Sequence, residues 1–157
     1  MQLNNRQTNW MLGAIAAGLL CICVASVVKP MRFESEKTRR EAQVIERLML
    51  IREAQGSYRT AHGHYAPSLD SLGLPDSVKQ IPFSNGKRFE LQTTVSEGKD
   101  GHKQPLMECG ARYADYLSGL AKGEIRNLTD EATATDQYPG LKIGDLNTSN
   151  NNAGNWE

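Results

Sequence analysis

The chain has no excess charge of either sign, few cysteines and few histidines. Lysines plus arginines and aspartates plus glutamates each number 18, so no global charge argues for binding nucleic acid or an acidic substrate. Of the three cysteines, Cys21 and Cys23 lie in an apolar run, which leaves Cys109 alone in the rest of the chain and excludes a disulfide scaffold. His62 and His64 stand at i, i+2 without the further ligands of a stable metal site, so we expect loop histidines and no bound metal.

The sequence also lacks a catalytic pattern. Cys109 has no histidine and acid nearby in sequence, and the aspartates are scattered without a paired arrangement. No glycine-containing segment has the spacing of a phosphate-binding or dinucleotide-binding loop. We therefore expect a protein that is not an enzyme and that carries no cofactor.

What the chain does have is an apolar run from Trp10 to Val28, nineteen residues without a charge. Crossing a bilayer core as a helix requires about 20 such residues. A cleaved signal peptide has a shorter apolar region of about 7–15 residues and a junction of small residues, whereas residues 27–30 read Val-Val-Lys-Pro. We predict a short amino-terminal tail over residues 1–9 and an uncleaved transmembrane helix over residues 10–28.

Small residues recur on one side of this predicted span. They form two overlapping pairs of small residues four positions apart, which would let another helix approach closely; the four are Gly13, Ala14, Ala17 and Gly18. We predict helix packing through this face. The alternative is that alanine and glycine are simply common in membrane helices.

The direction of the span is ambiguous from charge alone. Arg6 is the one basic side chain before it, whereas five follow within about fifteen residues, namely Lys29, Arg32, Lys37, Arg39 and Arg40. The positive-inside rule would keep the following domain in the cytoplasm, but long domains translocate largely regardless of flanking charge. Both orientations stay open at this point.

Residues 29–58 predict a second helical segment that continues the span as a stalk. Between Met31 and Gln55 there is no proline or glycine, and good helix formers dominate. Residues at spacings of three and four predict a buried stripe in its second half, consisting of Val44, Leu48, Ile51, Gln55 and Tyr58, widened by Ile45. Residues 33–43 are almost wholly polar, so we expect this part to stand outside the domain, with Pro30 tolerated at the junction.

Residues 59–157 predict a small α+β domain with an antiparallel sheet. Alternating residues indicate a strand over 88–95, and turn residues at 97–101 lead to a second strand around 106–111. Residues 124–135 have helical spacing, and residues 141–144 form a short alternating strand.

The chain ends in an asparagine-rich segment with a penultimate tryptophan, Trp156. Such ends are usually frayed, but a tryptophan is a large apolar group to leave in water. We predict that Trp156 and Asn152 dock onto the domain or a partner, together with Tyr58 and Tyr65. The alternative is a disordered tail.

The order of parts resembles that of type IV pilins and type II secretion pseudopilins. The similarity rests on residues 51–58, Ile-Arg-Glu-Ala-Gln-Gly-Ser-Tyr, followed by residues 62–72, His-Gly-His-Tyr-Ala-Pro-Ser-Leu-Asp-Ser-Leu. It implies a pseudopilin-like fold in which a long amino-terminal helix carries a small sheet. No prepilin-peptidase leader is visible, so we expect a fixed assembly element rather than a subunit of a growing fibre.

A second resemblance is to small single-span envelope proteins of Bacteroidota. It rests on residues 30–33, 44–48, 138–144 and the terminal Asn-Asn-Asn-Ala-Gly-Asn-Trp-Glu of residues 150–157. It implies a bacterial inner-membrane protein with a periplasmic domain. We expect this protein to have a structural or accessory role in an envelope assembly. The expected partners are the bilayer and integral membrane or envelope proteins, with self-association an option and no nucleic acid. The alternative function is a membrane-tethered binding module for a protein, peptide or glycan.

Overall fold

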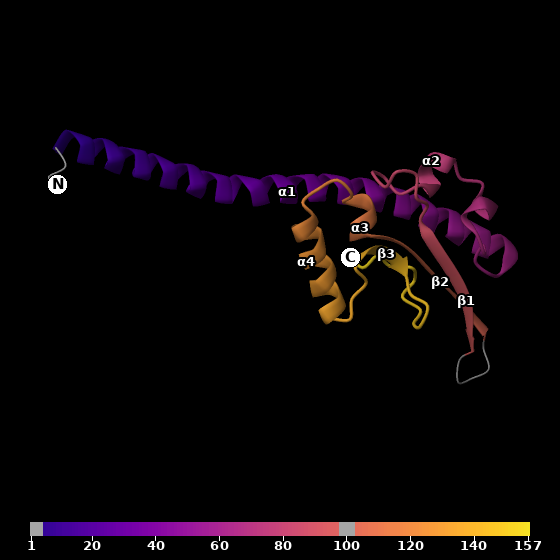
Figure 1. Cartoon of the computed structure of the whole chain (residues 1–157). Coiled ribbons are helices and arrows are strands. Elements are labelled where there is room, and N and C mark those ends of the chain that lie inside the picture. Colours follow the sequence, from indigo (N-terminus) through magenta and orange to yellow (C-terminus); the bar gives the residue numbers. More distant parts are fainter. Residues whose placement is uncertain (1–4, 98–102) are drawn as a thin grey trace. The chain divides into compact units, whose positions relative to one another are not determined.

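The computed structural model describes residues 5–97 and 103–157, and within the first range it leaves out the side chains of residues 5–8, 25, 27 and 29. It is an α+β structure with one long helix and a small three-stranded antiparallel sheet, as predicted (Figure 1). The chain divides into two compact units, residues 1–36 and residues 37–157. The predicted turn at 97–101 falls almost entirely outside the described residues.

Helix α1 runs from Asn5 to His62 and contains Pro30. In the unit of residues 37–157, β1 and β2 run obliquely away from the final part of α1 (Figure 1). There burial confirms the predicted stripe at Val44, Leu48 and Ile51, which are fully inaccessible to solvent, whereas Ile45 and Tyr58 are only half-buried. This side of α1 forms one wall of the core.

The apolar run in the first unit is helical and solvent-exposed. Leu12, Ile15, Leu19 and Ile22 each expose between 57% and 64% of their surface. In residues 5–97 and 103–157 no helix meets the combined length and hydrophobicity expected of a membrane span.

The sheet has the order β1-β2-β3, with all pairs antiparallel. Its strands are β1 (Glu90–Glu97), β2 (Lys103–Arg112) and β3 (Gly140–Gly144). Leu91 pairs with Cys109, which pairs with Ile143, so these three side chains share a face. Cys109 and Ile143 are fully buried, which places the core on this face.

Strand β1 begins two residues later than predicted. Residues 88 and 89 pair instead with the preceding connection, because the N–H of Phe89 donates to the carbonyl of Lys79 at 3.0 Å and Gln80 bridges to Arg88. That connection contains a 3-10 helix, η1 (Leu69–Leu72), and α2 (Asp76–Lys79).

Ion pairs fasten this connection to the start of the sheet. Asp70 of η1 receives hydrogen bonds from Lys79 and Arg88. The guanidinium of Arg88, followed by the ammonium of Lys79, lowers the pKa of the Asp70 carboxyl from 3.8 to about 2. The carboxylate form is therefore the one that the folded chain favours.

The remaining helices are α3 (Tyr113–Tyr116), which follows β2 directly, and α4 (Lys122–Ala134). They correct one prediction about α1. Residues 33–43 were expected to stand outside the domain, but Arg40 donates to the carbonyls of Tyr116 and Ser118 at 3.0 and 2.8 Å. The hydroxyl of Tyr116, whose residue is fully buried, donates to Glu41 at 3.3 Å. Charged hydrogen bonds thus extend the packed part of α1 beyond its apolar stripe.

Candidate functional site

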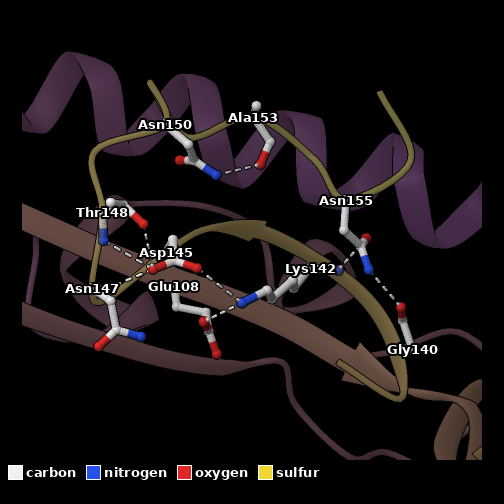
Figure 2. Close-up of polar contacts among 9 residues, drawn as sticks. All are labelled: Glu108, Gly140, Lys142, Asp145, Asn147, Thr148, Asn150, Ala153 and Asn155. Atoms are coloured by element: carbon white, nitrogen blue, oxygen red, sulfur yellow. Dashed lines mark hydrogen bonds and ion pairs between the residues drawn. The ribbon is translucent and has the colours of Figure 1, made fainter. Parts of the chain in front are cut away.

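The strongest candidate site lies around residues 145–157, which we call the carboxyl-terminal clasp. It extends the sheet beyond β3: the N–H of Gly144 donates to the carbonyl of Ala153, and the N–H of Asn155 donates to the carbonyl of Lys142, each at 3.0 Å. The side chain of Asn155 accepts from the N–H of Lys142 at 3.0 Å and donates to the carbonyl of Gly140 at 2.9 Å (Figure 2). The clasp therefore covers backbone groups that the edge of β3 would otherwise expose.

Asp145 organises the first turn of the clasp. Its carboxylate accepts from the N–H groups of Asn147 and Thr148 at 2.7 and 3.0 Å (Figure 2). The N–H of Asn147 is the main cause that lowers the pKa of Asp145. Lys142 lies beside it and pairs with Glu108 of β2 at 2.7 Å. Partial burial of Lys142 lowers its pKa, but Glu108 and Asp145 raise it by more. The net effect is a raised pKa, which favours the ammonium form.

Trp156 lies half-buried and folds back over Gly154. A Cβ built on Gly154 would lie only 2.5 Å from the Cε2 and Cζ2 atoms of the Trp156 ring. No real side chain tolerates that separation, so glycine is what allows the ring to approach the chain this closely.

Arg52 of α1 and Tyr65, three residues after the end of α1, hold the other side of the clasp. Arg52 pairs with Glu157 at 2.7 Å and donates to the carbonyl of Asn151 at 3.2 Å. The amide of Asn152 donates to the hydroxyl of Tyr65 at 2.9 Å. The structure thus places Asn152 and Tyr65 in contact and Trp156 within the same segment.

Tyr58, the fourth residue predicted to take part in docking, lies elsewhere. Its ring stacks on His62, with ring centres 4.1 Å apart. It therefore belongs to an aromatic group at the end of α1, with His62 and His64.

A shallow groove of about 460 Å³ runs between α1 and the clasp. Its apolar part is formed by Met49 and Leu50, each more than 40% exposed. Its polar lining comes from both elements, namely Arg52, Glu53, Asn151 and Asn152, with Gly56 at one end. Such a groove suits a side chain or short segment of a partner better than an enclosed small molecule.

The predicted helix-packing residues lie in the first unit. A Cβ on Gly13 or on Gly18 would meet nothing within 4 Å, and Ala14 and Ala17 are exposed. Their packing role stays a prediction.

The structure also shows the surroundings of Cys109 and of the side chains that could bind a metal. Cys109 is fully buried, and burial followed by the nearby Glu108 raises the pKa of its thiol to about 12. A thiol held in its protonated form is a poor nucleophile. Within the described part of the chain, no group of three or more histidine, cysteine or acidic side chains has the arrangement of a metal centre.

Sequence reasoning missed several residues that matter here. Gln55 was assigned only to an apolar stripe, yet it both donates to and accepts from the backbone of Ala66, at 3.2 and 2.9 Å. Arg52 and Asn155 carry no local signal, since their partners lie far away in sequence. The position of Gln55, a polar residue within the predicted stripe, was the one sequence feature that indicated a buried hydrogen bond.

Comparisons with models of protein families, with curated proteins and with solved structures yielded no match for this chain.

Proposed function

We propose that this protein is a non-enzymatic structural or accessory subunit of a bacterial inner-membrane or envelope assembly, with a pseudopilin-like architecture. In this proposal residues 10–28 cross the membrane once and the domain of residues 37–157 is periplasmic. The observation that carries the proposal is the uncharged run at 10–28 together with the exposure of its large side chains. Aliphatic side chains exposed in this number are typical of a surface that lipid or another protein covers.

The domain supports the same proposal from its own construction. Its core contains buried side chains of α1, β2 and β3. Its carboxyl-terminal segment binds the same helix through the ion pair and hydrogen bond of Arg52. The core and the carboxyl-terminal segment of the domain both contact α1. A long helix with two such contacts is suited to holding the domain in a fixed place. This is a scaffold's property and requires no bound substrate.

The alternative function is a membrane-tethered module that binds a protein, peptide or glycan. The groove between α1 and the clasp favours it, because exposed Met49 and Leu50 lie beside Arg52 and Glu53. Apolar contacts flanked by both charges are typical of a transient protein interface.

Purification of the full chain in a mild detergent distinguishes the two. The structural proposal expects integral membrane proteins to co-purify in stoichiometric amounts. Replacing Gly13 and Gly18 by leucine should release them, whereas the matched pair Leu12→Ile and Leu19→Ile should not. Recovery of a monomer whose association with a periplasmic ligand is lost in Met49→Asp would instead favour the binding module.

Topology has a separate test. Protease added to spheroplasts should degrade the domain if it is periplasmic. Full protection, with digestion after the membrane is permeabilised, would contradict the periplasmic placement.

A further inference from the structure

Three rings gather at the end of α1, on Tyr58, His62 and His64. Tyr58 stacks on His62 with ring centres 4.1 Å apart and planes inclined by 18°. The His64 ring lies 5.8 Å from Tyr58 and 6.2 Å from His62, measured between ring centres. Both histidines are exposed to solvent.

The hydrogen bonds of the two imidazoles define which nitrogen is available. Nδ1 of His62 lies 3.0 Å from the carbonyl oxygen of Tyr58, and Nδ1 of His64 lies 3.0 Å from the carbonyl oxygen of Tyr65. A carbonyl oxygen accepts only, so each Nδ1 must carry the proton and donate. In the neutral rings the lone pair then resides on Nε2 of both histidines.

This is the arrangement in which proteins prepare histidine as a metal ligand. A ligating imidazole almost always donates its second nitrogen to a carbonyl or carboxylate, which sets the tautomer and the ring orientation. Here two neighbouring imidazoles are set in that way by backbone carbonyls, and Tyr58 further holds the plane of His62.

The separation of the rings suits one shared ion. With nitrogen–metal bonds of about 2.0–2.1 Å, an ion bound by two Nε2 atoms lies roughly 3.2 Å from each ring centre. The ring centres then lie about 4.5 Å apart for a right angle at the ion and about 6.5 Å apart for a linear arrangement, and the observed separation of 6.2 Å falls within this range. Binding requires the exposed imidazoles to turn both Nε2 atoms toward the ion.

The turn between the histidines supports the same geometry. Gly63 has a φ of +77° and its N–H donates to the carbonyl of Arg59 at 2.8 Å, which ends α1. The left-handed conformation reverses the chain within one residue, so that His62 and His64 come together instead of lying on successive positions of a helix. Glycine is the residue that adopts this conformation without strain.

We propose that His62 and His64 form an open binding site for a late first-row divalent cation, with Cu²⁺ the tightest and Ni²⁺ and Zn²⁺ weaker. Neutral imidazole suits these metals, and their affinities follow this order at nitrogen sites, with copper above both neighbours. Two protein ligands leave the other coordination positions to water or to a ligand from outside. The proposal is independent of the structural role proposed above.

The test uses the untagged full chain in detergent, with Cys21→Ser and Cys23→Ser to remove the two exposed thiols. Titration with Cu²⁺ should saturate at one ion per chain, and its electron paramagnetic resonance spectrum should show coupling to two imidazole nitrogens. Loss of even an outer-shell partner of a metal ligand costs about 10–100-fold in affinity. His62→Gln and His64→Gln should each therefore weaken binding by at least about tenfold, and the double variant should abolish it.

His102→Gln is the matched control, since it removes the third histidine of the sequence. Its affinity and spectrum should equal those of the parent chain. Unchanged binding in the double variant, or an equal loss in His102→Gln, would overturn the proposal. If the glutamine variants unfold, the parent chain still decides: Cu²⁺ should broaden the ring-proton resonances of His62 and His64 before all others, and broadening that begins elsewhere would contradict the site.

Discussion

In α1, large aliphatic side chains occur both at residues 10–28 and at residues 44–55, but the fully buried ones among the described side chains, Val44, Leu48 and Ile51, all lie in the second segment. Leu19 exposes 59% of its surface, whereas Leu48 exposes none. The buried residues of the second segment repeat every three to four positions, whereas the first segment is uncharged throughout. The comparison teaches that apolar residues of one helix are buried where they repeat at helical spacing beside the rest of the domain, and that an apolar run by itself does not predict burial within the chain.

The largest expected effect concerns this contrast directly. Leu48→Ala should lower the free energy of unfolding of the domain by about 2–5 kcal/mol, because it opens a cavity in a closed core. Leu19→Ala, measured in the same detergent, should change it by less than about 0.5 kcal/mol. Chemical denaturation followed by circular dichroism measures both, and equal effects of the two substitutions would break the comparison.

A second prediction sharpens the account of the buried stripe. Gln55→Leu makes the stripe more apolar but leaves the N–H and carbonyl of Ala66 without the partners that Gln55 provides. An unsatisfied buried polar group costs about 1–3 kcal/mol, so we expect a loss of roughly 2 kcal/mol. The exposed neighbour Glu53→Leu serves as the control. Stabilisation by Gln55→Leu would show that these hydrogen bonds contribute little.

The clasp should contribute less than the core to the free energy of unfolding. Trp156 is half-buried, so Trp156→Ala should cost about 1–2 kcal/mol, below the 3–5 kcal/mol of a fully buried aromatic ring. Gly154→Ala should reproduce much of this loss, because its methyl group would occupy the place of the ring. Thermal unfolding measures both effects. An unaltered melting temperature in the two variants would mean that the segment is not docked.

The smallest expected effect is electrostatic and appears only in acid. The folded-state pKa of Asp70 lies at about 2, below its ordinary 3.8, so its contribution to stability is complete above pH 4. That contribution decreases as the pH falls from about 4 to 2. Asp70→Asn should flatten this part of the curve. Denaturation midpoints between pH 2 and 5.5 give the comparison, and parallel curves for the parent and Asp70→Asn would contradict it.

Much of the fold could be predicted from periodicity. The stripe of α1 and the alternation in β1 depend on neighbouring residues, so the sequence displays them locally. The beginning of β1 could not be placed, because residues 88 and 89 pair with the connection at 79–80. The packing of Arg40 and Glu41 was missed for a related reason: hydrogen bonds to α3 leave no apolar pattern.

The candidate site was predictable only in part. An apolar ring near the end of a polar segment suggested a docking role for Trp156, but its partner Gly154 is recognised only from the close approach of their atoms. The partners of Arg52 lie about a hundred residues away in sequence. The available Nε2 atoms of His62 and His64 depend on which carbonyl each ring faces, and a sequence contains no record of that.

The central claim is that residues 10–28 anchor the domain in a bilayer, and vesicle flotation tests it most directly. The full chain, reconstituted into lipid vesicles and washed in alkaline carbonate, should float with the lipid. A variant with Ile15→Lys, Leu19→Lys and Ile22→Lys should remain in the soluble fraction with its domain folded, because lysine at the centre of a span costs about 2.5–3.5 kcal/mol per residue. Flotation of this variant to the same extent, or failure of the parent chain to float, would contradict the claim.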